Sequence, residues 1–184
     1  MARPTWEEYF MAQAFLVAQR SPCKSRKVGA VLVKDKRVIA AGYNGPPSGH
    51  PHCESCVRRE KGIEIGKGMS EMCPNVHAEQ NCINQLAYMG GGSATGSTIY
   101  VVITPCKWCL TSLINAGVKK IVFYRDYPSE LVDSILKHSS IEMAKYSGRP
   151  VEEVLVDGIL LGVGKTFDES FKAELLTNIK GDKK

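Results

Sequence analysis

Residues 98–117 read TIYVVITPCKWCLTSLINAG, a β-branched apolar run followed by a short turn and a second apolar stretch. Thr98 to Ile103 is predicted to form a buried strand, because β-branched residues pack well on a pleated surface. Thr104 suits an N-cap and Pro105 suits the first helical position, where its missing N–H costs no hydrogen bond. Asn115-Ala116-Gly117 ends the predicted helix with a glycine. The segment therefore predicts a strand, a tight turn and a helix.

Upstream residues predict further elements of both kinds. A helix is expected from His77 to Met89, stopped by Gly90-Gly91-Gly92. Thr5-Trp6-Glu7-Glu8 resembles a capping box that opens the first helix. The apolar runs Val28 to Val33 and Val38 to Ala41 predict a hairpin. Between the hairpin and the helix, residues 50–76 are expected to be irregular and to need a stabilising link such as a bound metal ion.

The pattern continues downstream with less definition. Ile121 to Tyr124 predicts a strand and Ser129 to Lys137 a helix, whereas Ile141 to Tyr146 fits either element. Gly158 to Gly164 is interpreted as a short apolar strand and not as a phosphate loop. Alternating strands and helices predict parallel pairing, and the hairpin adds antiparallel pairing. The expected fold class is α/β, with a mixed central sheet covered by helices on both faces.

Composition limits the classes of protein. With 184 residues and 43% apolar residues, the chain suits one compact domain. It has no apolar run of the roughly 18 to 20 residues that span a bilayer, and its N-terminus lacks a secretory signal, so we expect no membrane association and a cytoplasmic location. A net charge of +5 suits a phosphate-bearing ligand and is too weak to argue for duplex DNA. Seven cysteines, an odd number, favour metal ligation over disulfides.

Two short motifs carry chemistry: His77-Ala78-Glu79 and Pro105-Cys106-Lys107-Trp108-Cys109, each at the start of a predicted helix. Spacing of three places the thiols of Cys106 and Cys109 on one helix face, near a helix N-terminus that favours thiolates. With His77 they make three ligands for Zn²⁺ and leave a fourth position for water, as in catalytic zinc sites. Glu79 is then placed to move the protons of that water.

Each motif alone is weak, since Cys-x-x-Cys also occurs in structural zinc sites and redox pairs. Together and in this order, His-x-Glu and Pro-Cys-x-x-Cys are the signature of zinc nucleobase deaminases. The chain resembles the deoxycytidylate (dCMP) deaminase family of the cytidine deaminase superfamily from about Tyr9 to Tyr127. The resemblance also includes residues 23–30 (CKSRKVGA), residues 42–47 (GYNGPP) and residues 115–117 (NAG).

The resemblance implies a three-layer α/β/α cytidine deaminase-like fold and hydrolytic conversion of dCMP to dUMP and ammonia, which supplies dUMP for dTTP synthesis. Residues 1–140 would form the CMP/dCMP-type deaminase domain, and residues 141–184 a C-terminal extension of unknown role packed on it. His77, Cys106 and Cys109 would hold the catalytic zinc, with Glu79 as the proton shuttle. Four residues are assigned to substrate binding: Arg26, Asn44, Ala78 and Tyr127.

Within that set, Asn44 matches a sugar-contacting position and Tyr127 an aromatic of the nucleotide pocket. Arg26 is our choice for the phosphate, because a guanidinium binds phosphate bidentately. Two alternatives stay open, since Arg26 could be a solvated loop charge and Tyr127 a packed rim aromatic. The resemblance further implies dCTP and dTTP as effectors at Gly42, Tyr43 and Gly45, and a homo-oligomer, with a hexamer favoured. This segment could equally be a bare turn.

A second, structural zinc is implied by family ligands that match Cys23 and Cys53. The long loop adds Cys56 and Cys73, and a four-cysteine site would staple it. The alternative is a loop with free thiols.

Other functions fit the sequence less well. A tRNA adenosine deaminase is disfavoured by the 33 positions, with a cysteine-bearing loop, between Asn44 and His77. A bifunctional dCMP/dCTP deaminase is harder to separate from a dCMP deaminase. A non-enzymatic, zinc-stapled module for single-stranded nucleic acid finds weak support in Trp108, Tyr124 and Tyr127, yet it leaves Glu79 without a purpose. We expect no stable nucleic-acid partner.

Overall fold

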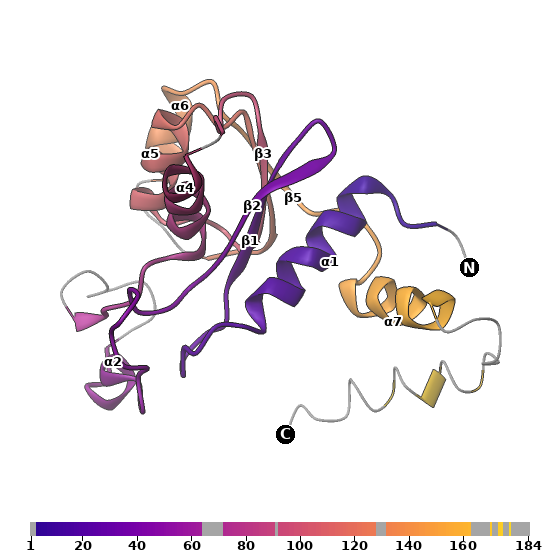
Figure 1. Cartoon of the computed structure of the whole chain (residues 1–184), viewed down its shortest axis with the longest axis horizontal. Coiled ribbons are helices and arrows are strands. Elements are labelled where there is room, and N and C mark those ends of the chain that lie inside the picture. Colours follow the sequence, from indigo (N-terminus) through magenta and orange to yellow (C-terminus); the bar gives the residue numbers. More distant parts are fainter. Residues whose placement is uncertain are drawn as a thin grey trace.

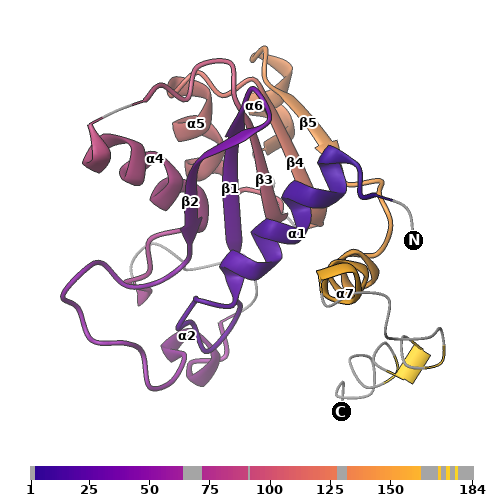
Figure 2. The same ribbon diagram turned by 45° about the vertical axis from the view of Figure 1, so that its right-hand side comes forward.

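The computed structural model describes residues 3–63, 72–90, 92–127 and 132–162, together with residues 170, 173, 174 and 177. Its elements follow one another in a mixed order (Figures 1 and 2). They are α1 (Trp6–Ala18), β1 (Gly29–Lys34), β2 (Arg37–Tyr43), α2 (Val57–Glu60), α4 (Ala78–Met89), β3 (Thr98–Ile103), α5 (Lys107–Asn115), β4 (Lys120–Arg125), α6 (Val132–Lys137), β5 (Glu142–Lys145) and α7 (Val151–Gly162).

One five-stranded sheet forms the middle layer, in the order β2-β1-β3-β4-β5. The predicted hairpin is confirmed, since β1 pairs antiparallel with β2, and β1 also pairs antiparallel with β3. The strands β3, β4 and β5 are parallel. Helices α4, α5 and α6 cover one face and α1 and α7 the other (Figure 1). The predicted three-layer α/β/α arrangement with a mixed sheet is confirmed.

Two apolar cores lie on the two faces of this sheet. In β1, Ala30 and Leu32 face the core under α4 and α5, whereas Val31 and Val33 face the core under α1. All four are buried, because successive side chains of a strand point to opposite faces and helices cover both. Among the described helices, none combines the length and apolarity needed to cross a bilayer.

Two glycines let helices approach the sheet at backbone distance. A Cβ built on Gly29 would lie 2.1 Å from the carbonyl oxygen of Ala14 in α1. A Cβ on Gly42 would lie 2.4 Å from the carbonyl oxygen of Ala78, at the start of α4. These separations exclude any side chain, so both helices pack closer to the sheet than a residue with a Cβ would allow.

The start of α5 differs from the prediction. Thr104 was expected as its N-cap, but the N-cap is Cys106 and the helix begins at Lys107. The reason is the neighbouring strand, because both the backbone N–H and the hydroxyl of Thr104 donate to the carbonyl oxygen of Arg125. Thr104 therefore prolongs the pairing of β3 with β4, and the helix starts two residues later than expected.

In the C-terminal half, the structure decides one element that the sequence left open and contradicts one predicted element. The ambiguous run 141–146 contains a strand, β5, which forms the edge of the sheet. The apolar run from Gly158 was wrongly interpreted as a strand, since α7 continues to Gly162, while residues 163 and 164 lie outside the described part. Val151 and Val154 start a helical repeat buried against α1, and an apolar run alone does not separate helix from strand.

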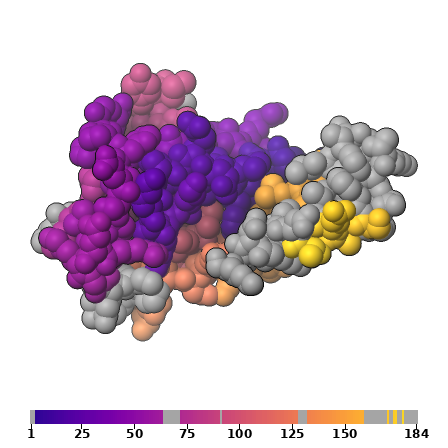
Figure 3. Space-filling model, turned by 90° about the horizontal axis from the view of Figure 1, so that it is seen from below, coloured from indigo at the N-terminus to yellow at the C-terminus, as the bar shows by residue number. Residues whose placement is uncertain are grey.

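Other predicted elements are found close to their expected places. The expected helix 129–137 appears as α6, with residues 129–131 outside the described part. The irregular segment 50–76 contains one helical turn, α2, and its residues 64–71 lie outside the described part. Seen from below, the residues around α2 lie at the opposite end of the molecule from the described C-terminal residues (Figure 3).

A buried ionic network joins α1 to α7. The predicted capping box is confirmed, since the Glu8 carboxylate accepts from the Thr5 N–H (2.8 Å) and the Thr5 hydroxyl accepts from the Glu8 N–H (3.2 Å). The Arg149 guanidinium donates to Glu8 (2.9 Å) and to Asp157 of α7 (2.7 Å). Its hydrogen bond lowers the pKa of Glu8 from 4.5 to about 2.

This network predicts acid-dependent stability. The pKa of Glu8 is lower in the folded chain, so its stabilisation is complete above about pH 4.5 and is lost as the pH falls towards 2. Glu8→Gln should reduce the free energy of unfolding by about 2 kcal/mol at pH 7, the usual size for a charge-assisted hydrogen bond. The difference from the parent should shrink below pH 4.5 in urea titrations. The control is Glu7→Gln, which changes a neighbouring carboxylate that accepts from the backbone N–H of Ser147. An equal loss of unfolding free energy in both variants would contradict the role assigned to Glu8.

Candidate active site

The pocket lies where the carboxyl ends of parallel strands meet the beginnings of two helices. Ile103 and Thr104 at the end of β3 line it, together with Tyr127, just beyond β4. The N-caps of α4 and α5, His77 and Cys106, lie on the same wall. Crevices at the carboxyl ends of strands are the usual binding sites of open α/β sheets. Both helix N-termini direct their partial positive charge at this pocket.

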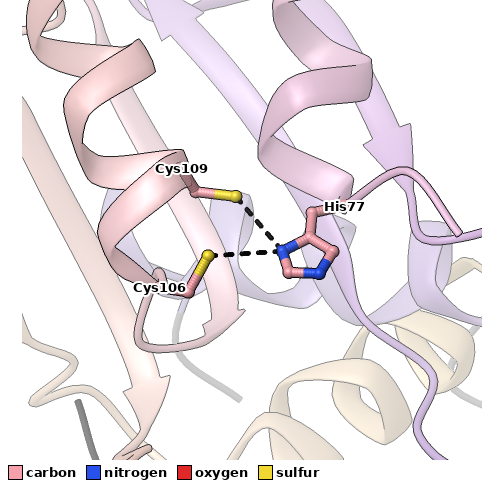
Figure 4. A group of neighbouring side chains, drawn as sticks. All are labelled: His77, Cys106 and Cys109. Carbon is pink, nitrogen blue, oxygen red and sulfur yellow. Dashed lines mark hydrogen bonds between the residues drawn. The ribbon is translucent and has the colours of Figure 1, made fainter. Parts of the chain in front are cut away.

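Three metal-binding side chains converge there. The Nδ1 atom of His77 lies 3.5 Å from Cys106 Sγ and 3.3 Å from Cys109 Sγ (Figure 4). Tetrahedral zinc, with one nitrogen ligand and sulfur ligands at their usual bond lengths, requires nitrogen–sulfur separations of about 3.5 Å. The two nitrogen–sulfur distances therefore match those of a zinc site. Within the described residues they are the only such cluster of three or more.

The contacts within the cluster shift the pKa values of its three members in different directions. Hydrogen bonding with Cys109 lowers the pKa of the Cys106 thiol to about 4. The same contact raises the pKa of Cys109, and the contact with Cys106 raises that of His77. These contacts favour the thiolate of Cys106 and the protonated forms of Cys109 and His77. Because metal ligation needs deprotonated thiolates and neutral imidazole, a bound Zn²⁺ would take the place of those protons.

Glu79 lies beside the cluster without joining it. It is the second residue of α4, its side chain is buried, and it lines the pocket together with Ala78. Burial raises the pKa of its carboxyl group, because the charged form loses its hydration. A buried carboxyl group next to a metal site, and outside its ligand set, is suited to accept and return a proton.

Arg26 and Tyr127 form the outer part of the pocket. The Arg26 guanidinium carbon lies 5.0 Å from the centroid of the Tyr127 ring, at cation–π distance. Both side chains are half-buried pocket residues, whereas Lys24 and Lys27 are exposed. The structure thus distinguishes Arg26 from its basic neighbours and places it where an anionic group of a ligand could be bound.

Asn44 is held by the protein on both sides of its amide. Its Oδ1 accepts from the Val28 N–H (2.8 Å) and lies 2.7 Å from the Ser21 hydroxyl. Its Nδ2 donates to the carbonyl oxygen of Arg26 (2.9 Å). These partners fix the orientation of the amide and leave one N–H of Nδ2 for the pocket that Asn44 lines. Asn44 is thus a structural brace as well as a candidate ligand contact.

The candidate effector residues make contacts that stabilise the fold of this chain. Gly42 permits the close approach of α4, and the Tyr43 carbonyl oxygen accepts from the Asn81 amide (2.7 Å). Gly45 exchanges two backbone hydrogen bonds with Val76, the residue before His77. Together these contacts fix the start of α4, and with it the imidazole of His77. An effector role for Gly42, Tyr43 and Gly45 stays a prediction.

The four cysteines predicted for a second zinc are less close together. Cys23, Cys56 and Cys73 line the same pocket, while Cys53 Sγ lies 4.0 Å from Asn75 Oδ1. All four are described as free thiols, and no three of their sulfur atoms lie within 4.8 Å of one another. Backbone hydrogen bonds, chiefly from Arg59, lower the pKa of Cys56.

The sequence analysis missed several residues of the pocket. Arg58 and Arg59 of α2 line it, and Arg59 donates through Nε to the Ser25 hydroxyl (3.2 Å). A basic doublet directly after a cysteine pair was a usable signal for them. Ser21, which lies behind the pocket and holds Asn44, gave no signal, because an isolated serine acquires its partners only in the folded chain.

Comparison with known proteins agrees with the geometry. Residues 4–125 match the family model of the cytidine and deoxycytidylate deaminase zinc-binding region. A deoxycytidylate deaminase of Mycobacterium phage D29 is 41% identical over 134 residues, which cover 71% of this chain and 99% of the phage protein. The ComE operon protein 2 of Bacillus subtilis is 35% identical, over 96% of this chain and 85% of the relative.

A solved structure shows the same likeness in three dimensions. The dCMP deaminase of cyanophage S-TIM5, crystallised with dCMP and dUMP, superposes with a TM-score of 0.65. The two chains are 32% identical, and the match covers 79% of this chain and 99% of the phage enzyme. The likeness therefore extends over nearly the whole length of the phage enzyme.

The cluster predicts which cysteines hold metal. Cys106→Ser should lose one equivalent of zinc after dialysis, because it removes one of the three ligands. The matched control is Cys82→Ser, a buried thiol of α4 that donates to the Ala30 carbonyl oxygen and whose pKa is raised by burial. This variant should keep its zinc. Mass spectrometry of the metal content measures both, and retention of all zinc by the Cys106 variant would exclude the proposed ligand.

Proposed function

Because the chain belongs to the family of cytidine and deoxycytidylate deaminases, and is thus a hydrolase of the deaminase class, we propose that it converts dCMP to dUMP and ammonia. The observation that carries the proposal is one pocket with a donor set for zinc, a buried carboxyl group and a guanidinium. These groups match the three needs of the reaction: activation of water, transfer of a proton and recognition of a phosphate.

Proton transfer is assigned to Glu79. Zinc, when bound by His77, Cys106 and Cys109, supplies water activated as a nucleophile at neutral pH. Hydrolytic deamination adds that water at C4 of the cytosine ring and releases the amino group as ammonia. Protons must therefore leave the water and reach the ring and the departing amine. The Glu79 carboxyl group accepts and returns them, since it lines the pocket and burial raises its pKa.

Recognition of the nucleotide is assigned to the outer pocket. Arg26 would bind the 5′-phosphate, supported by its half-buried position over the Tyr127 ring. Tyr127 and Asn44 would line the part of the pocket that holds the sugar and the base. Ala78 is fully buried, and its small side chain leaves the pocket wall beside Glu79 close to the backbone of α4. The phage relative bound to dCMP and dUMP supports a monophosphate ligand.

The physiological role follows from the product. As a dCMP deaminase the protein would supply dUMP for dTTP synthesis, with dCTP and dTTP as effectors and a homo-oligomer, a hexamer in our preference, as the working form. The cytoplasmic location expected from the sequence also stays a prediction. A bifunctional enzyme that also accepts dCTP differs only at the outer pocket, and turnover of dCTP would distinguish it.

A nucleic-acid-binding module is less well supported. Its three aromatics do not form one stacking surface, because the Tyr124 ring packs against Phe15 and Tyr146 and Tyr127 lies in the pocket. Trp108 is exposed, but it lies on α5 with only Lys107 against its ring among the described contacts. Stacking along a single strand needs successive rings on a continuous groove.

We also propose a second, structural zinc held by Cys23, Cys53, Cys56 and Cys73. Three of these thiols lie on the wall of one pocket, and the lowered pKa of Cys56 favours the thiolate that zinc binds. Binding would draw the sulfur atoms closer than they lie here and would tie α2 to the segment before β1.

The function is tested by turnover and by one substitution. The zinc-loaded protein should deaminate dCMP in preference to CMP, deoxycytidine and dCTP, followed by absorbance with and without dCTP or dTTP. Glu79→Gln should lower kcat by about a thousandfold while zinc is retained, since general acid–base catalysis contributes roughly that factor. Asp133→Asn, an exposed carboxylate of α6, serves as control. Salt-sensitive oligonucleotide binding without turnover would favour the binding module instead.

The second zinc is tested separately. Cys56→Ser should lose one equivalent of zinc and lower Tm by several degrees, because a structural metal contributes folding free energy. Ser55→Ala changes the exposed neighbour and should alter neither quantity. Unchanged zinc content and Tm in the Cys56 variant would leave these residues as free thiols.

A further inference from the structure

The segment that carries Arg26 is held from several sides by polar contacts. Between α1 and β1, residues 19–28 contain no regular element. The Arg26 N–H donates to Cys23 Sγ (3.5 Å), and the Cys23 N–H donates to the Ser21 hydroxyl (3.2 Å). From α2, Arg59 donates to both the hydroxyl (3.2 Å) and the carbonyl oxygen (3.5 Å) of Ser25. Such a loop depends on these bonds for its shape.

Asn44 binds the backbone on both sides of this loop's end. Its backbone N–H donates to the Val28 carbonyl oxygen, and its side chain bonds both the Val28 N–H and the Arg26 carbonyl oxygen. The amide of Asn44 therefore fixes the backbone at Arg26 directly. The position of the Asn44 amide therefore helps to set the point from which the Arg26 side chain leaves the backbone towards the pocket.

Ser21 in turn holds Asn44. Its side chain is 3% exposed, and its hydroxyl lies 2.7 Å from both the backbone oxygen and Oδ1 of Asn44. One hydroxyl proton serves these two acceptors, so the bond keeps the side chain of Asn44 folded against its own backbone. Ser21 itself is not among the residues that line the pocket.

The geometry points to Ser21 as a positioning residue for phosphate recognition, acting through Asn44 to hold Arg26 over the Tyr127 ring. The inference rests on the proposed function, in which Arg26 binds the phosphate of dCMP. Loss of the Ser21 hydroxyl frees one end of the brace, and the guanidinium then spends part of its time away from the phosphate. Discrimination between nucleotide and nucleoside falls, whereas chemistry at the zinc end of the pocket continues.

Ser21→Ala should raise KM for dCMP about tenfold, the factor that one buried hydrogen bond typically supplies, and leave kcat within twofold. For deoxycytidine, which has no phosphate but still reaches Asn44 through its sugar, kcat/KM should fall by less than for dCMP, so the dCMP-to-deoxycytidine ratio of kcat/KM should fall. The matched control is Ser97→Ala, a fully buried serine whose hydroxyl donates to the Ala94 carbonyl oxygen (2.6 Å) before β3. It should lower Tm and leave the dCMP-to-deoxycytidine ratio unchanged.

A double-mutant cycle with Arg26→Ala separates positioning from a general loss of structure. In the Arg26→Ala background, Ser21→Ala should change KM for dCMP by less than twofold, because the group it positions is gone. An equal tenfold effect in both backgrounds, or an unchanged substrate ratio in Ser21→Ala, would overturn the inference and leave the proposed function standing. Absence of dCMP turnover in the unsubstituted enzyme would overturn both.

Discussion

The meeting of one imidazole nitrogen with two sulfur atoms is the constraint on which the site depends. His77 is the N-cap of α4 and Cys106 that of α5, so the two helices must begin side by side at the same end of the sheet. Their starts are fixed by backbone contacts: the pairing of Gly45 with Val76 and the bond from Thr104 to Arg125. The geometry of a metal site built from two helix N-termini therefore depends on the backbone contacts at the ends of the neighbouring strands.

The sequence allowed the fold class and the grouping of His77, Cys106 and Cys109 to be predicted, because both have local signatures. The continuous apolar run of β1, the glycine stops and the Thr5 cap act within a few residues, and the cysteine spacing fixes a helix face. The cap of α5 was misplaced because a distant residue, Arg125, competes for Thr104. The run from Gly158 was wrongly assigned because an apolar run alone does not separate helix from strand, and the helix it continues begins with Val151 and Val154, which are buried against α1.

The Gly42–Gly45 segment shows how one motif serves several needs. Gly42 lets α4 pack close to the sheet, and Asn44 holds the loop that carries Arg26. Gly45 pairs with Val76, the residue before His77. Sequence alone predicted a turn, a sugar contact or an effector site for these residues. It did not predict the brace, because its three partners, Ser21, Arg26 and Val28, lie 16 or more positions away. Roles that depend on such tertiary partners leave no local pattern.

The ionic network between α1 and α7 also constrains how the chain assembles. Glu8 and Arg149 are separated by 141 positions, so their contact closes one of the longest loops in the molecule. During synthesis the chain lengthens from its N-terminus, and α1 and the strands as far as β4 emerge before Arg149 exists. Until residues 142–145 emerge, β4 is an open sheet edge, and until Arg149 emerges the carboxylate of Glu8 has no guanidinium partner. The nascent domain therefore covers this edge with β5 before α1 gains its ionic contact to α7.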